Sequence, residues 1–429
     1  MNKINKYKFN NLYDMASGIS TGKEQAGHGT PFVSFSTVFN NYFLPEELPD
    51  LMNTSNQEQE TYSVRKDDVF VTRTSETIDE LGMSSVALKD YPQATYSGFT
   101  KRLRPKQEGE VYAKYIGFYL RGDLFRKTMT NNAFMTLRAS FNEDIFSFLD
   151  LYLPEYKEQV KIGDFLYLIE KNIQVNKLIN DNLQKTIQTI YDYWFTQFDY
   201  PSKNGNPYKS SGGKMIWNDE IKKEIPEGWK VKCIKDCITH INTGLNPRDN
   251  FELNTGGSIR YITVKNLTSK GEIDFSECDL ITPQVKSLIN KRSMVRSGDI
   301  LFASISPLGR CYFVQETPLT WEINESVFSI RTDNNVLTPE YLYIFLMSDE
   351  FVKRAENSSA GSVFKGIRIS MLEDMKIVVP PKEIMIAFKE IISSQLQLRY
   401  QCEQESIKLS GLRDWLLPML MNGQVTIEN

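Results

Sequence analysis

Basic side chains beside serine, threonine and glycine mark several predicted loops of this 429-residue chain. Lysine and arginine side chains reach phosphates and base edges, and hydroxyl groups add hydrogen bonds to phosphate oxygens. Thr-Gly-Lys at residues 21–23 and Thr-Arg-Thr at residues 72–74 are two such places. We predict nucleic-acid contacts at five basic residues: Lys23, Arg73, Lys265, Arg310 and Lys365.

Cys233, Cys237 and His240 have the residue types of a zinc site. The chain contains a second copy of this segment near its N-terminus, and that copy places no ligand type at the matching positions: Asn11, Met15 and Gly18. A site that is apolar in one copy favours an apolar core position in the other. We therefore predict no metal and a core role for Cys237.

Other catalytic patterns are weak. Asp374-Met375-Lys376 has the Asp-x-Lys spacing of metal-dependent nucleases, and residues 204–210 resemble an amino-methyltransferase loop with one proline missing. A P-loop, a Gly-x-Gly-x-x-Gly loop and a nucleophile elbow are absent from the sequence. His28 and His240 do not coincide in the repeat. We predict a non-catalytic chain, with a nuclease or methyltransferase that uses an unrecognised active site as the alternative.

The chain is a tandem repeat. Residues 64–69 (VRKDDV) lie over residues 295–300 (VRSGDI). Further pairs follow in the same order: 7–22 over 229–244, 32–38 over 261–267 (both expected as strands), 115–120 over 341–346 (both expected as helices), 137–140 over 367–370, and Pro154 over Pro380. Each repeat is far larger than a solenoid unit, which indicates duplication of a whole domain. Because they lie in repeated motifs, we assign structural roles to Arg138, Arg368, Gly298 and Asp299.

A long helix with a seven-residue pattern ends each repeat, and each begins just after a proline. The first apolar seam is expected at Ile162, Leu166, Ile169, Ile173, Asn176, Asn180, Leu183, Ile187, Ile190 and Trp194. The second is expected at Ile384, Phe388, Ile391, Gln395, Leu398, Cys402, Glu405, Leu409, Leu412, Leu416 and Met419. Both seams become polar near the middle, so antiparallel packing would bring the polar layers together. The alternative is a mid-seam that is partly exposed or contacts another protein.

These elements define the organisation. We predict an α+β fold with two mixed α/β domains in tandem repeat and two long helices that form an antiparallel coiled coil. The expected segments are a first domain at 1–154, a central helix at 155–199, a flexible linker at 200–224, a second domain at 225–380, and a C-terminal helix and tail at 381–429.

The composition limits the expected partners and cellular location of the protein. The net charge of −4 neither proposes nor excludes a nucleic-acid partner, because charge can be distributed locally. The five cysteines all lie in the second half, and their odd number does not fit a disulfide framework. No apolar run approaches the length of about 18 residues that spans a bilayer, and the N-terminal residues do not form a secretion signal. We therefore expect a cytoplasmic protein without a membrane partner.

The sequence resembles the specificity subunits of type I restriction–modification systems over essentially its whole length. The motifs are "IPEGWKVKCIKDC" (225–237), "SGDILFASISPLG" (297–309), "VVPPKEIMIAFKEII" (378–392), "IQTIYDYWFTQFDYP" (187–201) and "LRDWLLPMLMNGQV" (412–425). Each motif is weak alone, but together, in order and in duplicate, they are specific.

The resemblance implies that each globular domain is a target recognition domain that reads one half of a split double-stranded DNA sequence. It implies a non-catalytic subunit that binds two modification subunits and, in the full complex, two restriction subunits. S-adenosylmethionine, ATP and Mg²⁺ would then be used by those partner subunits and not by this chain. A coiled-coil adaptor that binds only proteins is a third interpretation.

Overall fold

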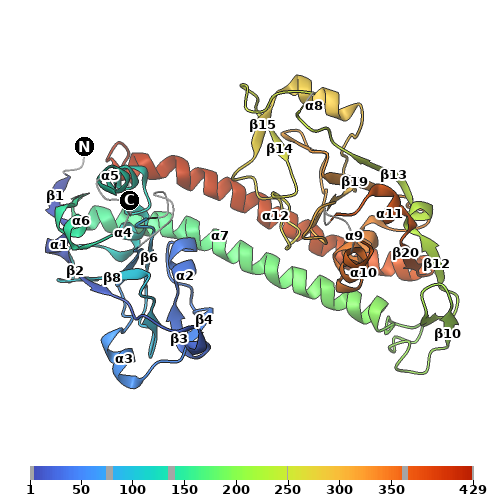
Figure 1. Cartoon of the computed structure of the whole chain (residues 1–429), viewed down its shortest axis with the longest axis horizontal. Helices are drawn as coiled ribbons and strands as arrows, with labels where there is room; N and C mark the ends of the chain where they lie inside the picture. The colour runs from blue at the N-terminus through green and yellow to red at the C-terminus, as the bar shows by residue number, and fades with distance from the viewer. Residues whose placement is uncertain (1–3, 74–80, 134–140, 249, 360–365, 428–429) are drawn as a thin grey trace. The chain divides into compact units, whose positions relative to one another are not determined.

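The computed structural model describes residues 4–73, 81–133, 141–248, 250–359 and 366–427. The chain divides into two compact units, one made of Met1–Gln174 with Ser406–Asn429 and the other of Val175–Glu405. Each unit combines strands, short helices and part of two long helices (Figure 1). The predicted α+β fold with two mixed domains is confirmed.

The first unit contains a four-stranded sheet in the order β2-β8-β5-β6, a three-stranded sheet β4-β3-β7 and a strand pair β1-β9. The strands are Asn5–Lys8 (β1), Tyr13–Ser17 (β2), Ala26–Val33 (β3), Asp50–Met52 (β4), Val69–Thr72 (β5), Ser84–Val86 (β6), Thr95–Tyr96 (β7), Thr100–Pro105 (β8) and Asp150–Leu153 (β9). Strand β5 is buried at all four positions, which explains why its sequence is apolar without alternation. It lies between β8 and β6, so the core of the unit forms around it.

Short helices connect these strands. They are Phe9–Leu12 (α1), Lys23–Gln25 (η1), Phe35–Asn40 (α2), Asn56–Thr61 (α3), Ala113–Tyr119 (α4), Asp123–Ala133 (α5) and Glu143–Phe148 (α6). The side chains of Ser34, Ser55 and Asn142 accept the free backbone N–H groups at the starts of α2, α3 and α6. Such caps fix where a helix begins. Helix α4 is buried along most of its length, and it packs into the same core as β5.

The second unit repeats this set of strands. They are Lys230–Cys233 (β12), Ile238–Thr243 (β13), Ile259–Ile262 (β14), Asp279–Ile281 (β15), Ile300–Ala303 (β16), Cys311–Phe313 (β17), Trp321–Ile323 (β18), Val327–Thr332 (β19) and Lys376–Val379 (β20). The short helices are Ile234–Cys237 (η4), Pro283–Asn290 (α8), Pro339–Met347 (α9), Asp349–Ser359 (α10) and Ile369–Asp374 (α11). Thr282 caps α8, and Pro283 occupies its first turn, where a missing N–H costs nothing.

The strand orders of the two units match strand for strand. The order β13-β19-β16-β17 repeats β2-β8-β5-β6, β15-β14-β18 repeats β4-β3-β7, and β12-β20 repeats β1-β9. The single parallel pair of each three-stranded sheet also recurs, as β3 with β7 and β14 with β18. The predicted duplication of a whole domain is confirmed.

Three of the predicted segment pairs agree with the structure. Residues 64–69 and 295–300 form the same turn into a central strand. Residues 115–120 and 341–346 are both helical, in α4 and α9. Residues 32–38 and 261–267 do correspond, but only their first two residues end a strand, because α2 begins at Phe35 and a turn follows Ile262.

The predicted pairing of residues 7–22 with 229–244 is wrong by three to four residues. The N–H group of Phe9 donates to Leu149 and that of Ile234 donates to Met375, at 3.0 and 2.9 Å, so Phe9 corresponds to Ile234. A bulge in β13 between Ile238 and His240 adds one residue further on. An ungapped comparison of short segments cannot include this bulge, and it favours chance identities such as Lys8 with Lys230 and Gly22 with Gly244.

Residues 137–140, which were predicted to pair with 367–370, lie outside the described residues, but the residue that follows them indicates a different alignment. The N–H groups of Phe141 and Ile367 make equivalent hydrogen bonds, to Arg73 and Ser304, at 2.8 Å each. Arg368 therefore corresponds to Asn142, and both residues precede an equivalent helix. The recurrence that suggested a structural role for Arg368 is absent.

The two long helices are Tyr156–Tyr191 (α7), extended by a π-helical turn at Asp192–Thr196 (η3), and Lys382–Met421 (α12). Each begins two residues after the proline that the sequence suggested, Pro154 or Pro380. At about 1.5 Å of rise per residue, they are roughly 54 and 60 Å long.

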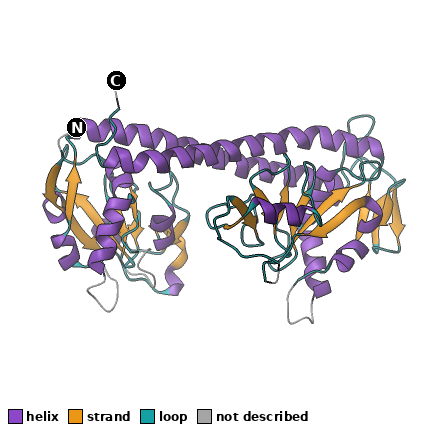
Figure 2. Ribbon diagram, turned by 90° about the horizontal axis from the view of Figure 1, so that it is seen from above, coloured by secondary structure: helices purple, strands orange, loops and turns teal. Residues whose placement is uncertain are grey.

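Within each unit the two long helices lie side by side (Figure 2), and their residue pairs show that they run antiparallel. In the first unit Glu170 of α7 pairs with Arg413 of α12 at 2.6 Å, and Leu166 shares a core with Leu417. In the second unit Asn176 donates to Glu405 at 3.1 Å, and Arg399 donates to Gln184 at 2.6 Å. Residue numbers therefore increase along α7 in the direction in which they decrease along α12. The predicted antiparallel coiled coil is confirmed, and the Asn176–Glu405 contact shows that polar mid-seam residues meet.

The seam predicted for α7 is correct, because its apolar positions are buried or half-buried and its two asparagines are buried. The seam predicted for α12 is partly wrong. Ile391, Leu398 and Leu412 are exposed, whereas Ile392, Leu396, Arg399 and Arg413 lie on the inner face. Buried arginines interrupt the apolar pattern of the inner face. The seven-residue apolar pattern in the sequence therefore partly follows exposed residues on the outer face.

The segment expected as a linker, residues 200–224, contains turns and part of a hairpin, Met215–Asn218 (β10) with Lys223–Pro226 (β11). Asp199 accepts hydrogen bonds from the backbone N–H and the hydroxyl of Ser210, at 2.7 and 2.5 Å. The rings of Tyr200 and Tyr208 stack with centroids 4.8 Å apart.

Candidate nucleic-acid interface

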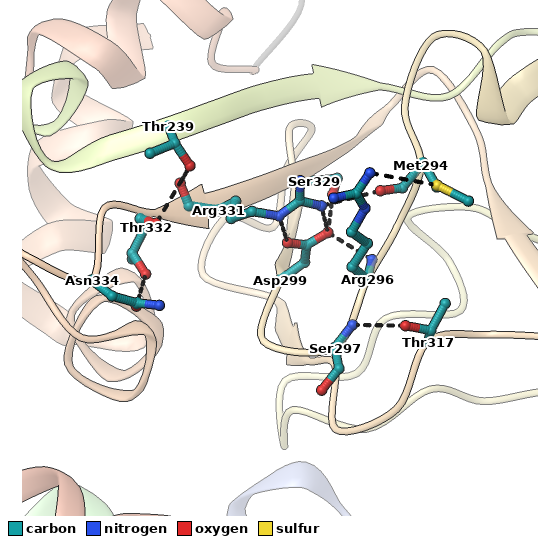
Figure 3. Close-up of polar contacts among 10 residues, drawn as sticks. All are labelled: Thr239, Met294, Arg296, Ser297, Asp299, Thr317, Ser329, Arg331, Thr332 and Asn334. Carbon is teal, nitrogen blue, oxygen red and sulfur yellow. Dashed lines mark hydrogen bonds and ion pairs between the residues drawn. The ribbon is translucent and has the colours of Figure 1, made fainter.

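A buried carboxylate fixes the turn that leads into the central strand of each unit. In the second unit Asp299 is fully buried, and its two oxygens accept Nε and Nη2 of Arg331 at 2.7 Å each (Figure 3). The same carboxylate accepts the N–H of Arg296 at 2.8 Å and the hydroxyl of Ser329 at 3.3 Å. Gly298 precedes it with φ +84°, a conformation that glycine adopts without strain. These contacts tie the start of β16 to β19.

The first unit repeats this arrangement with different residues. Asp68 is fully buried and accepts Nε and Nη2 of Arg104 at 2.7 and 2.6 Å, together with the N–H of Arg65 at 2.7 Å. Asp67 takes the place of Gly298 with φ +67°, which aspartate tolerates better than most residues. The turn was predicted from the sequence, but the two arginines that bind its carboxylate were not. Aligning "TKRLRP" (100–105) with "VFSIRT" (327–332) would have found them.

In the first unit the structure brings Arg73 close to the segment that leads to Lys23. Both side chains are exposed. The N–H of Arg73 donates to Phe99 at 2.8 Å, and the neighbouring N–H of Gly98 donates to Ile19 at 2.7 Å. The turn at residues 97–99 therefore holds together two loops that are about fifty residues apart in the sequence.

In the second unit the structure brings Lys265 and Arg310 together. Arg310 donates from Nη1 to the carbonyl of Val264 at 3.4 Å, and the next residue, Lys265, is exposed. Arg310 Nε has no hydrogen-bond partner among the residues that the structure describes. Gly366 pairs with Ile305 close by, but the adjacent Lys365 lies outside the described residues.

Arg138 and Arg368 were also predicted to have structural roles. Arg138 lies outside the described residues. Arg368 is exposed and occupies the residue before α11, where its side chain makes no cap. Its counterpart Asn142 does cap α6, by accepting the N–H of Ile145 at 3.0 Å. The geometry therefore links Gly298 and Asp299 to the turn but gives Arg368 no comparable contact.

The candidate zinc ligands occupy an ordinary strand junction. Cys237 is buried in the core, and burial raises the pKa of its thiol to about 11. Its structural counterpart is Leu12, not Met15, and Leu12 is also buried. Within the described residues no three His, Cys, Asp or Glu side chains gather as a metal site. The apolar core position expected for Cys237 is confirmed.

The Asp-x-Lys pattern is divided between two separate ion pairs. Asp374 pairs with Lys235 at 2.7 Å, and Lys376 pairs with Glu220 at 2.6 Å. The aspartate and lysine thus contact different partners.

Glu322 is a deeply buried carboxyl group with a raised pKa. Burial raises its pKa to about 7, and its Oε1 accepts the N–H of Ile323 at 3.2 Å. Nearby Lys286 instead donates to the carbonyls of Pro318 and Trp321, at 2.6 and 3.0 Å. Glu322 lies in strand β18, which pairs with β14, so it is part of the packed sheet.

The outer faces of the long helices carry exposed apolar side chains. On α7 these are Phe165, Leu168, Val175 and Leu178, and on α12 they are Ile386, Ile391, Leu398, Ile407, Leu412 and Trp415. Ile391 and Leu398 are separated by one heptad, and Leu412 lies two heptads beyond Leu398. An exposed apolar stripe at helical spacing is typical of a surface that binds another protein.

Within the described residues, none of the helices is both long and apolar enough to cross a bilayer.

Comparison with known proteins places these features in a family. The family model for the type I restriction modification DNA specificity domain matches twice, at residues 6–185 and 226–405. The type I restriction enzyme MjaIX specificity subunit of Methanocaldococcus jannaschii is 24% identical over 352 residues, covering 80% of this chain and 75% of that protein. The HindI specificity subunit of Haemophilus influenzae is 22% identical over 330 residues, covering 66% and 70%.

A solved structure shares the fold. The S subunit of a type I restriction-modification system from M. genitalium superposes with a TM-score of 0.57 at 13% identity, covering 98% of this chain and 96% of that one. Both matches of the family model include one mixed domain and continue into a long helix. The chain belongs to the type I restriction modification DNA specificity family.

Proposed function

We propose that this chain is the DNA-reading subunit of a type I restriction–modification complex and that each of its two domains reads one half of a split double-stranded target. One observation carries the proposal: the two units share a backbone scaffold but differ in the basic side chains at its loops. Arg73 and Ser304 occupy equivalent places, since their N–H groups make equivalent bonds, to Phe99 and Ser326. Two copies that read different half-sequences need this combination.

The five basic residues predicted from the sequence are the proposed DNA contacts. Lys23, Arg73 and Lys265 are exposed, and none of them is within ion-pair distance of an acidic group among the described residues. Arg310 has a buried Nε without a hydrogen-bond partner in the part of the chain that the structure describes. Free cations at loop ends can neutralise phosphates or donate to base edges. Lys365 remains a proposed contact from the sequence.

The paired helices are the proposed spacer. Each is continuous over 36 or 40 residues, and the largely buried Glu170–Arg413 ion pair helps to fix the register. A helical pair of this kind would fix both a distance and a rotational phase along B-DNA, and in this proposal it sets the gap between half-targets.

The exposed apolar stripes of α7 and α12 are the proposed docking surface for two modification subunits. Two restriction subunits join the full complex. S-adenosylmethionine, ATP and Mg²⁺ act in those partners, and this chain is a non-catalytic subunit that works in the cytoplasm. What supports this division of labour is the family membership, together with the scattered acidic and basic groups described above, which do not form a catalytic cluster.

Two other functions make different predictions. An enzyme, either a nuclease or a methyltransferase with an unrecognised site, would change DNA without partners. A coiled-coil adaptor would bind other proteins but not DNA.

A gel-shift series with the chain alone and with its modification subunits separates these cases. We expect tight, sequence-dependent binding with the modification subunits, and no cleavage or methylation by the chain alone. Product formation by the purified chain would support the enzyme. Complex formation with the partners without sequence-dependent DNA binding would support the adaptor.

A further inference from the structure

A tight turn between β7 and β8 presents an aromatic side chain to solvent. The ring of Phe99 is 67% exposed. The backbone of Phe99 is nevertheless held by hydrogen bonds on both sides. Its N–H donates to the hydroxyl of Ser97 at 3.2 Å, and its carbonyl accepts the N–H of Arg73 at 2.8 Å. Gly98 donates to Ile19 at 2.7 Å, and Thr100 donates to Ser97 at 2.9 Å. An exposed phenyl ring on a backbone this constrained is pre-organised for contact with a partner.

Two cations lie beside the turn that carries the ring. Arg73 donates from Nη1 to the carbonyl of Gly98 at 3.4 Å, and Lys101 donates to the hydroxyl of Ser17 at 2.7 Å. Neither cation has a carboxylate within ion-pair distance among the described residues. Partial burial lowers the pKa of Lys101, and the charge of Arg73 lowers it further, which the more distant carboxylate of Glu143 offsets only in part. The two cations are therefore close enough to repel each other. An anion beside this turn would relieve that repulsion.

The equivalent turn of the second unit has the same backbone but other side chains. Asn324 donates to Ile262 as Ser97 donates to Val33, at 2.9 and 3.0 Å. The N–H of Ser304 donates to Ser326 at 3.0 Å, in the place of the Arg73–Phe99 bond. The side chains Arg73, Phe99 and Lys101 are thus replaced by Ser304, Ser326 and Phe328.

This asymmetry identifies the partner. Two identical modification subunits would need the same side chains on both copies, whereas two half-targets of different sequence need different ones. We infer that Phe99 is a specificity-determining residue that contacts a base of the half-target read by the first unit, with Arg73 and Lys101 holding the adjacent phosphates. The inference rests on the proposed function and names the residue that performs the reading.

The chemistry of the side chain narrows what it reads. A phenyl ring cannot donate or accept a conventional hydrogen bond, so it reads bases through apolar contact. In the major groove the apolar group that distinguishes base pairs is the thymine methyl. Phe99 is therefore expected to act at an A·T or T·A pair of the target.

The test is methylome sequencing of cells that carry the full system with Phe99→Ala or Phe99→Leu. We expect Phe99→Ala to reduce discrimination at one A·T position about tenfold, within the range that a recognised base pair contributes. The other half of the target stays unchanged, and Phe99→Leu retains part of the preference because leucine is also apolar.

Phe148→Ala is the matched control. Phe148 is 69% exposed in the same unit, but its neighbouring cation Lys8 is paired with Asp150 at 2.9 Å. An unchanged target in Phe99→Ala, relaxation at a G·C pair, uniform weakening for all sequences, or the same effect from Phe148→Ala would each overturn the inference. A wild-type system that shows no split target would instead refute the proposed function.

Discussion

Replacing Asp299 with asparagine should loosen the central sheet of the second unit. Asparagine has nearly the same shape but lacks the charge and one acceptor oxygen. Asp299 is fully buried and accepts four hydrogen bonds, two of them from Arg331. Removing one partner of a buried ion pair typically costs 3–5 kcal/mol. Because the Arg331 side chain is 27% exposed and can partly reach water, we expect a cost of about 3 kcal/mol, at the low end of that range.

Hydrogen exchange followed by mass spectrometry measures this cost locally. Peptides that contain β16 and β19 should exchange through opening reactions that are about a hundredfold more favourable in Asp299→Asn than in the wild type. Peptides that contain β5 and β8 provide an internal control, because the Asp68–Arg104 pair of the first unit remains intact. The two units are expected to unfold in separate steps. A single unfolding midpoint for the whole chain would average the two stabilities, so a local measurement is needed.

A surface substitution gives the matched comparison. Glu227 pairs with Lys214 at 2.7 Å, but both side chains are largely exposed. Glu227→Gln should leave the exchange of β16 and β19 unchanged, since exposed ion pairs contribute little. If Asp299→Asn behaves like Glu227→Gln, or if β5 and β8 loosen as much as β16 and β19, the buried pair does not hold the turn as described.

Three further predictions follow from charge, length and burial. Alanine at Lys23, Arg73, Lys265, Arg310 or Lys365 should lower the slope of log affinity against log salt by roughly 0.9 wherever that side chain neutralises a phosphate, or relax one target position wherever it contacts a base. Fluorescence anisotropy across a salt series measures the slope, and unchanged binding in all five variants would contradict the assignment. Seven residues inserted in α7 between Glu170 and Asn176, and seven in α12 between Glu405 and Arg413, lengthen each helix by about 10 Å, so the gap between half-targets should grow by roughly three base pairs. Methylome sequencing reads the gap, and an active variant with the original gap would show that the helices are not the spacer. Burial raises the pKa of Glu322 to about 7 from an ordinary value of 4.5, so the folded state keeps a proton that the unfolded state loses between these values. Stability of the second unit should therefore fall as the pH rises from about 5 to 7. Glu322→Gln should reduce this dependence in urea titrations and leave the part contributed by Glu403, whose pKa burial also raises to about 7; an equal dependence in both proteins would contradict it.

The features that could be predicted from the sequence are those set by local pattern. The continuous apolar runs of β5 and β16, the Asp turns before them, and the prolines before α7 and α12 all lie within a few residues of the structure they specify. Because the pattern occurs twice in the same order, the two copies support each other. Domain duplication and the paired helices were therefore accessible without coordinates.

The features that could not be predicted depend on contacts between distant residues. Arg331 meets Asp299 across two paired strands, and the bulge in β13 that shifts the alignment is visible only in the pairing of β13 with β19. The inner face of α12 was misassigned because Arg399 and Arg413 occupy core positions, where they contact Gln184 and Glu170. A search for apolar residues passes over such positions.

The candidate nucleic-acid interface could also be predicted only in part. Lysine and arginine in loops are visible in the sequence, but their grouping is not. Arg73 approaches the loop that carries Lys23 only because the turn at residues 97–99 binds both segments. Phe99 was missed because an isolated phenylalanine in a sequence is usually a core residue, and only its exposure distinguishes it.

The division of recognition between two domains is tested most directly by a domain exchange. Residues 1–154 would be replaced by the equivalent domain of a relative, and Leu417, Leu420 and Met421 of α12, which pack into that domain's core, would be matched to the donor. Methylome sequencing of cells that carry the hybrid with its modification and restriction subunits should show one half of the target changed to that of the donor and the other half retained. A hybrid that is active but changes both halves, or neither, would contradict the account.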